Sequence, residues 1–370
     1  MKSLDDRAQR AGAIDELRGL AILLVVVYHA GPLAWRLVDY APDGWMRWPA
    51  HVSLLDVLAA PFLHFGFVGV HCFFVLSGFC IHLRAARTGE QPALRGYFLR
   101  RFWRIYPPYW IALALFVVWP YALARLGVTS TQGTATATDV ALHTTMLHTL
   151  APATFFSINP AFWSLATEEQ FYLAYPLIAR LLLGRVGARR VVLAALALSL
   201  VWRGVALALV PTTVDHFMDW RVLVHGLFVP RWFDWLLGCW IADAWARNPG
   251  LLQRNKARLA LAALGLLLAG AACRVHIAVD KLLSDILFSS AFAALTAAAL
   301  GNLFNGIPVA VRSLFSAVGR RAYAIYLVHQ PILDLPKLGV ALRLALAGVA
   351  SFVFGRAVEK PFEERARRVR

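Results

Sequence analysis

The fold of this chain is decided by the run Arg18-Gly19-Leu20-Ala21-Ile22-Leu23-Leu24-Val25-Val26-Val27-Tyr28-His29. The arginine and the histidine stand about three helical turns apart, so they share one face of a helix and lie roughly 16 Å apart along its axis. The apolar residues between them predict a membrane-spanning helix. Because ionisable groups inside such helices usually mark a site, we expect this helix to carry part of one.

The composition extends this prediction to the whole chain. Of 370 residues, 59% are hydrophobic and only 16% are charged, which is typical of a polytopic membrane protein. The net charge of +16 would suggest a nucleic-acid partner in a soluble protein. Here the basic residues lie between apolar segments, as they do in cytoplasmic loops, so we expect a lipid bilayer and no nucleic acid.

The apolar segments predict an all-α protein with about ten transmembrane helices, judged against the roughly 20 residues that one span requires. The expected spans are 17–36, 61–83, 105–124, 161–183, 191–210, 222–246, 259–277, 285–304, 313–333 and 338–357. Residues 138–158 contain Asp139, His143 and His148, and a full span there would move later basic clusters to the wrong side. We therefore expect a re-entrant or interfacial segment at 138–158.

Charge counting also predicts the orientation. With ten spans and a cytoplasmic N-terminus, most of the 37 lysines and arginines fall in cytoplasmic segments, so both termini should be cytoplasmic. No repeat and no soluble segment is apparent, and we expect residues 1–370 to form a single membrane domain without an appended soluble domain. The four cysteines show neither metal-ligand spacing nor paired external loops, so we expect no metal site and no disulfide.

The first motif, Asp15-Glu16-Leu17-Arg18-Gly19, leads into the helix that reaches His29. A desolvated, neutral imidazole is what a general base needs, because it can accept a proton. Taken alone, Arg18 could be an ordinary positive-inside anchor, and His29 could bond a neighbouring carbonyl. The two together favour a reaction site, with Asp15 as a further candidate.

Two more motifs place polar groups near the cytoplasmic side. The segment 66–79 contains His71 and Ser77; its small residues suit close helix packing, but Ser77 would lie about 6 Å from the cytoplasmic edge, near the level of Arg18. His71 would lie near the centre and is another candidate. The cluster of Arg100, Arg101 and Arg104 is either a basic anchor or a phosphate site, because forked guanidinium groups suit phosphates.

A fourth motif at 162–172 contains Trp163, Glu168 and Tyr172. Acidic residues contribute little to orientation, so a carboxylate here calls for another reason. If this helix enters from the outer side, Glu168 lies roughly 9 Å deep, close to the depth of about 12 Å that the same count gives for His29. We therefore expect Glu168 and His29 to meet.

The last motif, at 323–331, contains Tyr326 and His329. His329 would lie roughly 6 Å from the outer edge, alongside the level of Glu168. The tyrosines could equally be aromatic residues that only pack in the bundle.

These five motifs, in this order, resemble the acyltransferase type three family of integral membrane enzymes, from about Asp15 to Pro331. The resemblance implies a ten-helix protein in the cytoplasmic (inner) membrane of a bacterium. It would move an acyl group, often acetyl, from cytoplasmic acyl-CoA to a hydroxyl of a surface glycan, a lipid-linked sugar or a secondary metabolite. Acyl-CoA is then a co-substrate, acetyl-CoA being the first choice, and no bound cofactor is implied.

The resemblance also implies site residues. Its expected functional positions fall on Arg18 with His29, on 77–79, on the cluster Arg100, Arg101 and Arg104, and on Trp163 with Glu168. Two positions depart from the family's pattern: His71 stands where an acidic residue is often found, and Ala322 stands where a serine is often found. The first departure bears on donor or acceptor preference, and the second removes a hydroxyl.

Together, the depths and the resemblance predict a division of labour. We expect acyl-CoA to bind at the cytoplasmic side and a carbohydrate or glycolipid acceptor to enter from the outer side. His29 would remove the proton of the acceptor hydroxyl while Glu168 orients the imidazole or the sugar; an acyl-histidine intermediate is the less favoured variant. The expected donor-binding residues are Arg18, Ser77, Arg100, Arg101 and Arg104, and the expected acceptor-binding residues are Trp163, Tyr172, Tyr326 and His329.

Two other classes of protein remain open at this point. A secondary transporter would also carry intramembrane His, Glu and Arg residues, although the chain lacks the inverted repeats of such proteins. A non-catalytic membrane protein that binds acyl-CoA would need the basic cluster and not the histidine.

Overall fold

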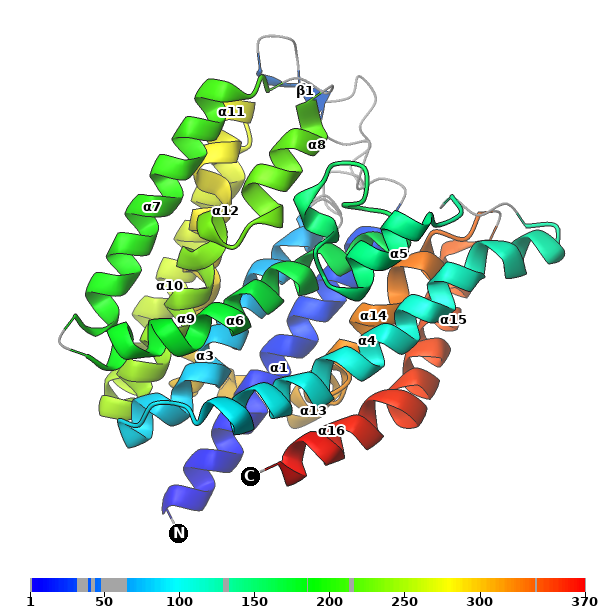
Figure 1. The fold of residues 1–370 in the computed structure, drawn as a ribbon. Helices are drawn as coiled ribbons and strands as arrows, with labels where there is room; N and C mark the ends of the chain where they lie inside the picture. The colour runs from blue at the N-terminus through cyan, green and yellow to red at the C-terminus, as the bar shows by residue number, and fades with distance from the viewer. Residues whose placement is uncertain are drawn as a thin grey trace.

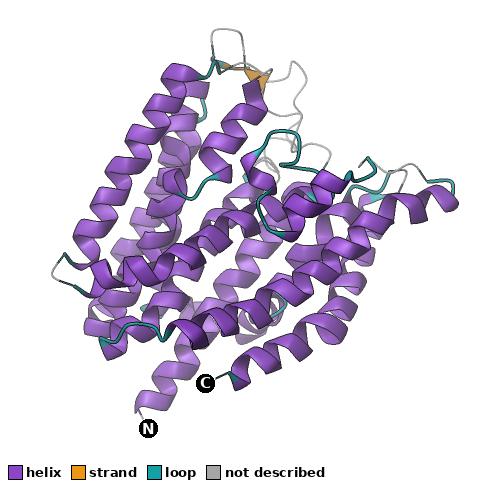
Figure 2. Ribbon diagram, in the orientation of Figure 1, coloured by secondary structure: helices purple, strands orange, loops and turns teal. Residues whose placement is uncertain are grey.

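The computed structural model describes residues 2–31, 39–40, 44–47, 65–128, 133–184, 186–212, 216–336 and 338–369. This part of the chain is built almost wholly of helices (Figures 1 and 2). Its one sheet consists of two strands of two residues each, β1 (Asp39–Tyr40) and β2 (Met46–Arg47), which pair antiparallel. The expectation of an all-α protein is confirmed at this level.

The helices follow one another with short connections. The first half contains α1 (Lys2–Ala30), η1 (Gly66–Val68), α3 (Gly69–Thr88), α4 (Leu94–Arg125), α5 (Ala137–Thr144), η2 (His148–Leu150), η3 (Pro160–Phe162), α6 (Trp163–Leu183) and α7 (Gly187–Leu209). The second half contains α8 (Phe217–Trp220), η5 (Arg221–Gly226), η6 (Val229–Arg231), α9 (Trp232–Arg247), α10 (Pro249–Cys273), α11 (Ile277–Val279), η7 (Asp280–Ser284), α12 (Asp285–Leu300), η8 (Leu303–Gly306), α13 (Val309–Gly319), α14 (Ala322–Leu333), α15 (Val340–Phe354), η9 (Gly355–Glu359) and α16 (Lys360–Arg368). Of the short elements, η5, η7 and η9 are π-helices.

Six of the described helical segments are long and apolar enough to cross a membrane. They are Gly66–Thr88, Leu94–Arg125, Gly187–Leu209, Pro249–Cys273, Ile277–Leu300 and Val340–Arg368. Several of them expose rows of leucine and valine, such as Leu261, Leu264 and Leu268 on α10, as expected for surfaces that face lipid. The molecule therefore has the character of an all-α membrane protein.

Two of the expected spans are broken in the structure. Residues 222–246 do not form one helix, because the chain leaves η5 at Gly226 and resumes only at η6. The side-chain amide of Gln170 satisfies the backbone there: its Nε2 donates to the Gly226 carbonyl at 2.8 Å, and its Oε1 accepts from the Phe228 N–H at 3.0 Å. Irregular backbone at membrane depth is tolerated when its polar groups find such partners.

The other broken span is 313–333, which divides into α13 and α14 at Arg320 and Arg321. These two arginines are exposed, which explains the break, because charged side chains are costly inside an apolar segment.

At 138–158 the structure has only the short helices α5 and η2. Residues 32–36 and 61–64 of two other expected spans lie outside the described residues.

Helix α1 packs against α3, α12, α13 and α14. Glycines at the crossings determine how closely the helix backbones approach. A Cβ on Gly19 would overlap the carbonyl oxygen of Phe315 in α13, and a Cβ on Gly319 would overlap that of Asp15 in α1. The same reciprocal pattern joins α3 to α9 through Gly78 and Gly238. Small residues let helix backbones approach in this way. Figure 1 shows both chain ends at one end of the bundle, with α1 rising from there toward α5 and α14.

Candidate active site

His29, near the end of α1, lies against His329 of α14. The Nδ1 atom of His29 and the Nε2 atom of His329 are 3.2 Å apart. His329 is fully buried, and its Nδ1 lies 2.9 Å from the Tyr326 carbonyl oxygen and 3.0 Å from that of Ile325. Carbonyls only accept, so Nδ1 of His329 carries the hydrogen and its Nε2 has a lone pair.

This tautomer fixes the state of His29 as well. With Nε2 of His329 as the acceptor, Nδ1 of His29 is the donor in the bond between the two rings. In a neutral His29 the remaining nitrogen, Nε2, then holds a lone pair. That is the arrangement of a general base whose orientation is set by a second group.

A pocket of about 610 Å³ opens beside this histidine pair. Its lining includes the polar and charged residues Asp139, Ser157, Gln330, Asp334 and Arg343. The remaining lining residues are His29, Ala30, Gly31, Gly133, Thr134, Ala135, Phe156, Ile158 and Pro160. The pocket therefore brings a basic nitrogen together with hydrogen-bonding groups suited to a hydroxylated ligand.

Asp334 and Arg343 are the charged residues of the pocket that the sequence reasoning missed. Asp334 ends α14, where burial raises the pKa of its carboxyl to about 6 although the charge of Arg343 opposes that rise. Arg343 donates to the Leu333 carbonyl. The signals in the sequence that could have pointed to this pair were an aspartate at the end of an apolar helix and an arginine inside the expected span 338–357.

Tyr326 and Trp163, expected at the acceptor, serve mainly as links in the structure. The hydroxyl of Tyr326 lies 2.6 Å from that of Ser164 and donates to the Ala161 carbonyl, which ties α14 to the start of α6. The Trp163 ring packs edge-on against His225, with centroids 5.5 Å apart. Neither residue lines the pocket beside His29.

The structure bonds Glu168 to Tyr172, and within the described residues its hydrogen bonds do not include His29. The hydroxyl of Tyr172 donates to the Glu168 carboxylate and lies 3.1 Å from the hydroxyl of Ser77. The depth count assumed that α6 enters from the outer surface near Phe162. In the structure Phe162 and Ala161 are buried, so α6 begins among packed residues.

The Glu168 cluster instead joins the basic groups. Trp235 donates from Nε1 to Ser77 at 3.2 Å, and the guanidinium of Arg101 lies over the Tyr172 ring, 5.5 Å from its centroid. The positive charges of Arg101 and Arg18 both act on the Glu168 carboxylate. Five of the residues singled out in the sequence thus belong to one cluster: Arg18, Ser77, Arg101, Glu168 and Tyr172.

The four arginines of the basic motifs divide into two groups by the direction in which their side chains lie: Arg18 and Arg101 belong to the Glu168 cluster, and Arg100 and Arg104 contact the C-terminal segment. Arg18 lies 3.5 Å from Asp15 and 3.4 Å from the Cys80 sulfur, and its charge also reaches Arg104. Arg101 faces inward to Tyr172. Arg100 and Arg104 stand four residues apart on another face, where Arg100 donates to the Val369 carbonyl at 3.5 Å and Arg104 pairs with Glu363 at 3.5 Å.

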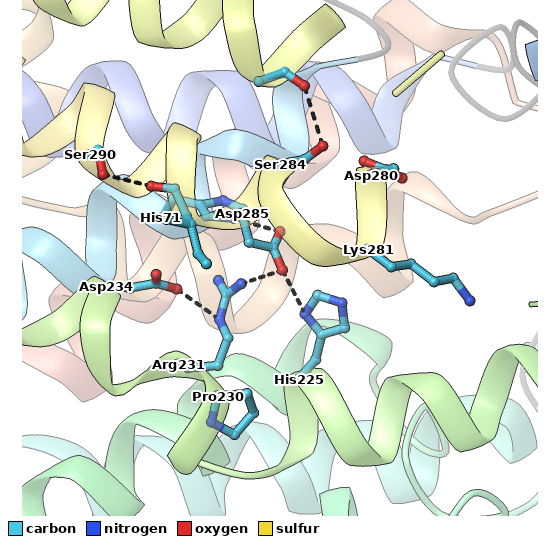
Figure 3. Close-up of polar contacts among 12 residues, drawn as sticks. His71, His225, Pro230, Arg231, Asp234, Asp280, Lys281, Ser284, Asp285 and Ser290 are labelled. Carbon is cyan, nitrogen blue, oxygen red and sulfur yellow. Dashed lines mark hydrogen bonds and ion pairs between the residues drawn. The ribbon is translucent and has the colours of Figure 1, made fainter. Parts of the chain in front are cut away.

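His71 lies in a different, buried network of charges (Figure 3). Its Nε2 is 2.9 Å from Asp285, which also pairs with Arg203 at 2.9 Å and Arg231 at 2.7 Å. Arg231 in turn pairs with Asp234 at 3.0 Å. Two arginines and two aspartates pair within this network, which joins α3, α7, η6, α9 and α12. An acidic side chain at position 71 would face Asp285, which accounts for a histidine there.

Comparison with known proteins gives the following matches. A family model described as an acyltransferase domain matches residues 12–355. The peptidoglycan O-acetyltransferase OatA of Listeria monocytogenes is 26% identical over 347 residues, which cover 87% of this chain and 49% of that protein. The O-acetyltransferase OatA of Staphylococcus aureus is 23% identical over 384 residues, covering 95% of this chain and 57% of that protein. The chain thus spans about half the length of these curated relatives. No solved structure matches it.

Proposed function

Because the chain belongs to the acyltransferase domain family, we propose that it is a membrane-bound O-acyltransferase that moves an acetyl group from acyl-CoA to a hydroxyl of a carbohydrate. The observation that carries this proposal is the oriented pair His29 and His329 beside a polar pocket. Its acetyl and carbohydrate parts are supported by the relatives, whose names specify O-acetylation and, in one case, peptidoglycan.

We place the protein in the cytoplasmic membrane of a bacterium with both termini in the cytoplasm. The chain then crosses the membrane ten times. This count takes the segment from η5 to α9 as one broken span, takes α13 and α14 together as another, and leaves 138–158 as an interfacial segment. Six apolar helical segments and the position of both chain ends at one end of the bundle support this topology.

We propose that the donor binds at the end of the bundle where the chain begins. Arg18, Arg100, Arg101 and Arg104 supply positive charge there, and guanidinium groups suit the phosphates of coenzyme A. Ser77 and Tyr172, with Glu168, stand between these arginines and the interior. We assign Glu168 to this donor cluster and no longer to the orientation of His29.

The acceptor would occupy the pocket beside His29, with its hydroxyl at Nε2. As the imidazole takes the hydroxyl proton, the oxygen bonds to the acyl carbonyl carbon, the bond from carbon to sulfur breaks, and the thiolate of CoA takes up the proton. Holding both substrates away from water supplies proximity and limits hydrolysis of the thioester. The pocket's polar lining of Asp139, Ser157, Gln330 and Asp334 offers partners for the other sugar hydroxyls.

The test is acceptor-dependent release of CoA. The purified chain in lipid nanodiscs is incubated with acetyl-CoA, with or without soluble peptidoglycan fragments or other oligosaccharides, and free thiol is measured. The proposal predicts release that depends on a carbohydrate and an acetyl ester found on it by mass spectrometry. A transporter or a passive acyl-CoA-binding protein would release no CoA with any acceptor.

A further inference from the structure

The helix α16 lies beyond residues 12–355, which the family model matches, and it packs along the first half of α4. Trp103 of α4 contacts two residues of α16. The Phe362 ring stacks on it with centroids 6.2 Å apart, and the Arg365 guanidinium lies 3.8 Å from its ring centroid on the indole. A stacked ring and a cation on one indole give this contact a defined geometry.

The same packing places acidic groups of the segment 359–363 on the basic cluster. Glu363 pairs with Arg104 at 3.5 Å and with Arg367 at 2.8 Å. The charge of Glu359, one helical turn earlier, also acts on both Arg104 and Arg18. Two carboxylates therefore lie beside the guanidinium groups to which we assign the phosphates of coenzyme A.

We propose that α16 is a lid on the donor site, in which Glu363 occupies Arg104 until the phosphates of CoA displace it. This inference rests on the proposed function, because it needs the arginines as the donor site. The pair between Arg104 and Glu363 is suited to exchange: its atoms are 3.5 Å apart and the Arg104 side chain is 42% exposed, so it is a weak ion pair. A phosphate carries more charge than one carboxylate and can replace it.

The helix itself supplies a matched control. Glu364 is the next residue along, carries the same charge, and lies on another side of the helix, 3.9 Å from Lys360 and 51% exposed. Its removal changes the net charge as much as the removal of Glu363 does. A difference between the two variants therefore reports the ion pairs of Glu363 with Arg104 and Arg367 and not the general field of the protein.

The experiment is a titration of the full chain in nanodiscs with CoA, by calorimetry, for wild type, Glu363→Gln and Glu364→Gln. The lid predicts that Glu363→Gln binds CoA about two- to fivefold more tightly, the range expected from the loss of one partly exposed ion pair, while Glu364→Gln stays at the wild-type value. Amide hydrogen exchange of residues 360–368 should also rise when CoA is added to wild type.

The lid would be overturned if Glu363→Gln bound CoA with an affinity equal to or lower than that of Glu364→Gln. Glu363 would then have no effect on CoA binding, or it would hold Arg104 in position for the ligand. Unchanged hydrogen exchange in 360–368 on saturation with CoA would overturn it too. Absence of CoA binding in wild type and both variants is a separate result, which removes the proposed donor site and its lid together.

Discussion

The reactivity that we assign to His29 depends on a hydrogen bond from its ring to His329. His329 is itself held by two backbone carbonyls, so it accepts that hydrogen bond and His29 donates it. The reactive nitrogen of His29 is then Nε2, and no carboxylate is needed to set its tautomer. This differs from a triad, in which an acid orients the base.

Removal of the His329 ring should therefore slow the chemical step. We expect His329→Leu to lower kcat by about 100-fold, because general base catalysis contributes about 10² to 10⁴. Binding of acetyl-CoA should not change, since His329 lies away from the arginines. His329→Gln should recover part of the rate, because a glutamine can donate to the carbonyls and accept from His29. Steady-state kinetics of the three proteins measure this, and equal kcat for His329→Leu and wild type would remove His329 from the mechanism.

Asp334 makes acceptor binding depend on pH. Burial raises the pKa of its carboxyl to about 6, so the group is protonated below that pH and charged above it. The charged carboxylate accepts hydrogen bonds from sugar hydroxyls more strongly than the neutral carboxyl does. The KM for the carbohydrate substrate should therefore fall as pH rises through about 6. In Asp334→Asn this step should vanish while any step due to His29 stays. A KM profile between pH 5 and 8 that is the same in both proteins would contradict the assignment.

The sequence singles out residues whose type is rare for their setting. Arg18 and His29 stood out because ionisable groups in an apolar run are expensive. Asp334 and Arg343 were missed because each is an ordinary residue near a helix end, and only the fold brings them to one pocket. His329 was identified but expected at the acceptor, since sequence cannot show that its ring faces another ring.

At the scale of helices, the close crossing of α1 and α13 at Gly19 and Gly319 determines where Arg18 and His29 lie. Gly19 stands next to Arg18 and has no room for a side chain, because α13 passes directly over it. Close contact of this kind locks the rotation of α1 about its own axis. The glycines therefore hold Arg18 and His29 of α1 in register with the rest of the bundle.

Gly19→Ala should loosen this crossing and destabilise the protein by about 1–3 kcal/mol, the usual cost of overpacking. Gly348→Ala in α15 is the matched control, because a Cβ there meets nothing within 4 Å. The control should keep or slightly raise the stability, since alanine is the better helix former. Thermal unfolding in detergent compares the two. If Gly19→Ala and Gly348→Ala unfolded at the same temperature, the crossing of α1 and α13 would not be tightly packed.

Element boundaries show what hydropathy can and cannot predict. Long apolar helices such as α7 and α10 were found because every residue of the pattern contributes to the same signal. The break after Gly226 was missed because it depends on one side chain, Gln170, from a helix far away in the sequence. The division at Arg320 and Arg321 had a signal in those charges, but the apolar run around them masked it.

At the scale of the whole molecule, α1 connects two ends with different chemistry. Its first part lies beside the arginine cluster, and its last part reaches the polar pocket at His29. Two substrates approaching from opposite sides would therefore meet along one helix. The charge pattern and the apolar segments predict this polarity, but they could not predict that Glu168 bonds to Tyr172 of its own helix.

Two cysteines can test this polarity. Cys80 is exposed beside Arg18, and Cys273 is partly exposed at the end of α10, while Cys72 and Cys239 are buried. A membrane-impermeant maleimide should label Cys80 only from the cytoplasmic side in a Cys273→Ser background, and Cys273 only from the outer side in a Cys80→Ser background. Labelling of both from the same side of the membrane would refute the topology. CoA should also protect Cys80, because it would bind at Arg18.

The central claim is that His29 is the base that activates the acceptor hydroxyl, and one measurement tests it most directly. Acetyl transfer from acetyl-CoA to the carbohydrate acceptor is followed in nanodiscs for wild type and His29→Ala, with CoA protection of Cys80 as the check that the variant is folded and binds the donor. We predict that His29→Ala loses at least about 100-fold in transfer rate while Cys80 stays protected. A variant that transfers acetyl at the wild-type rate would contradict the account.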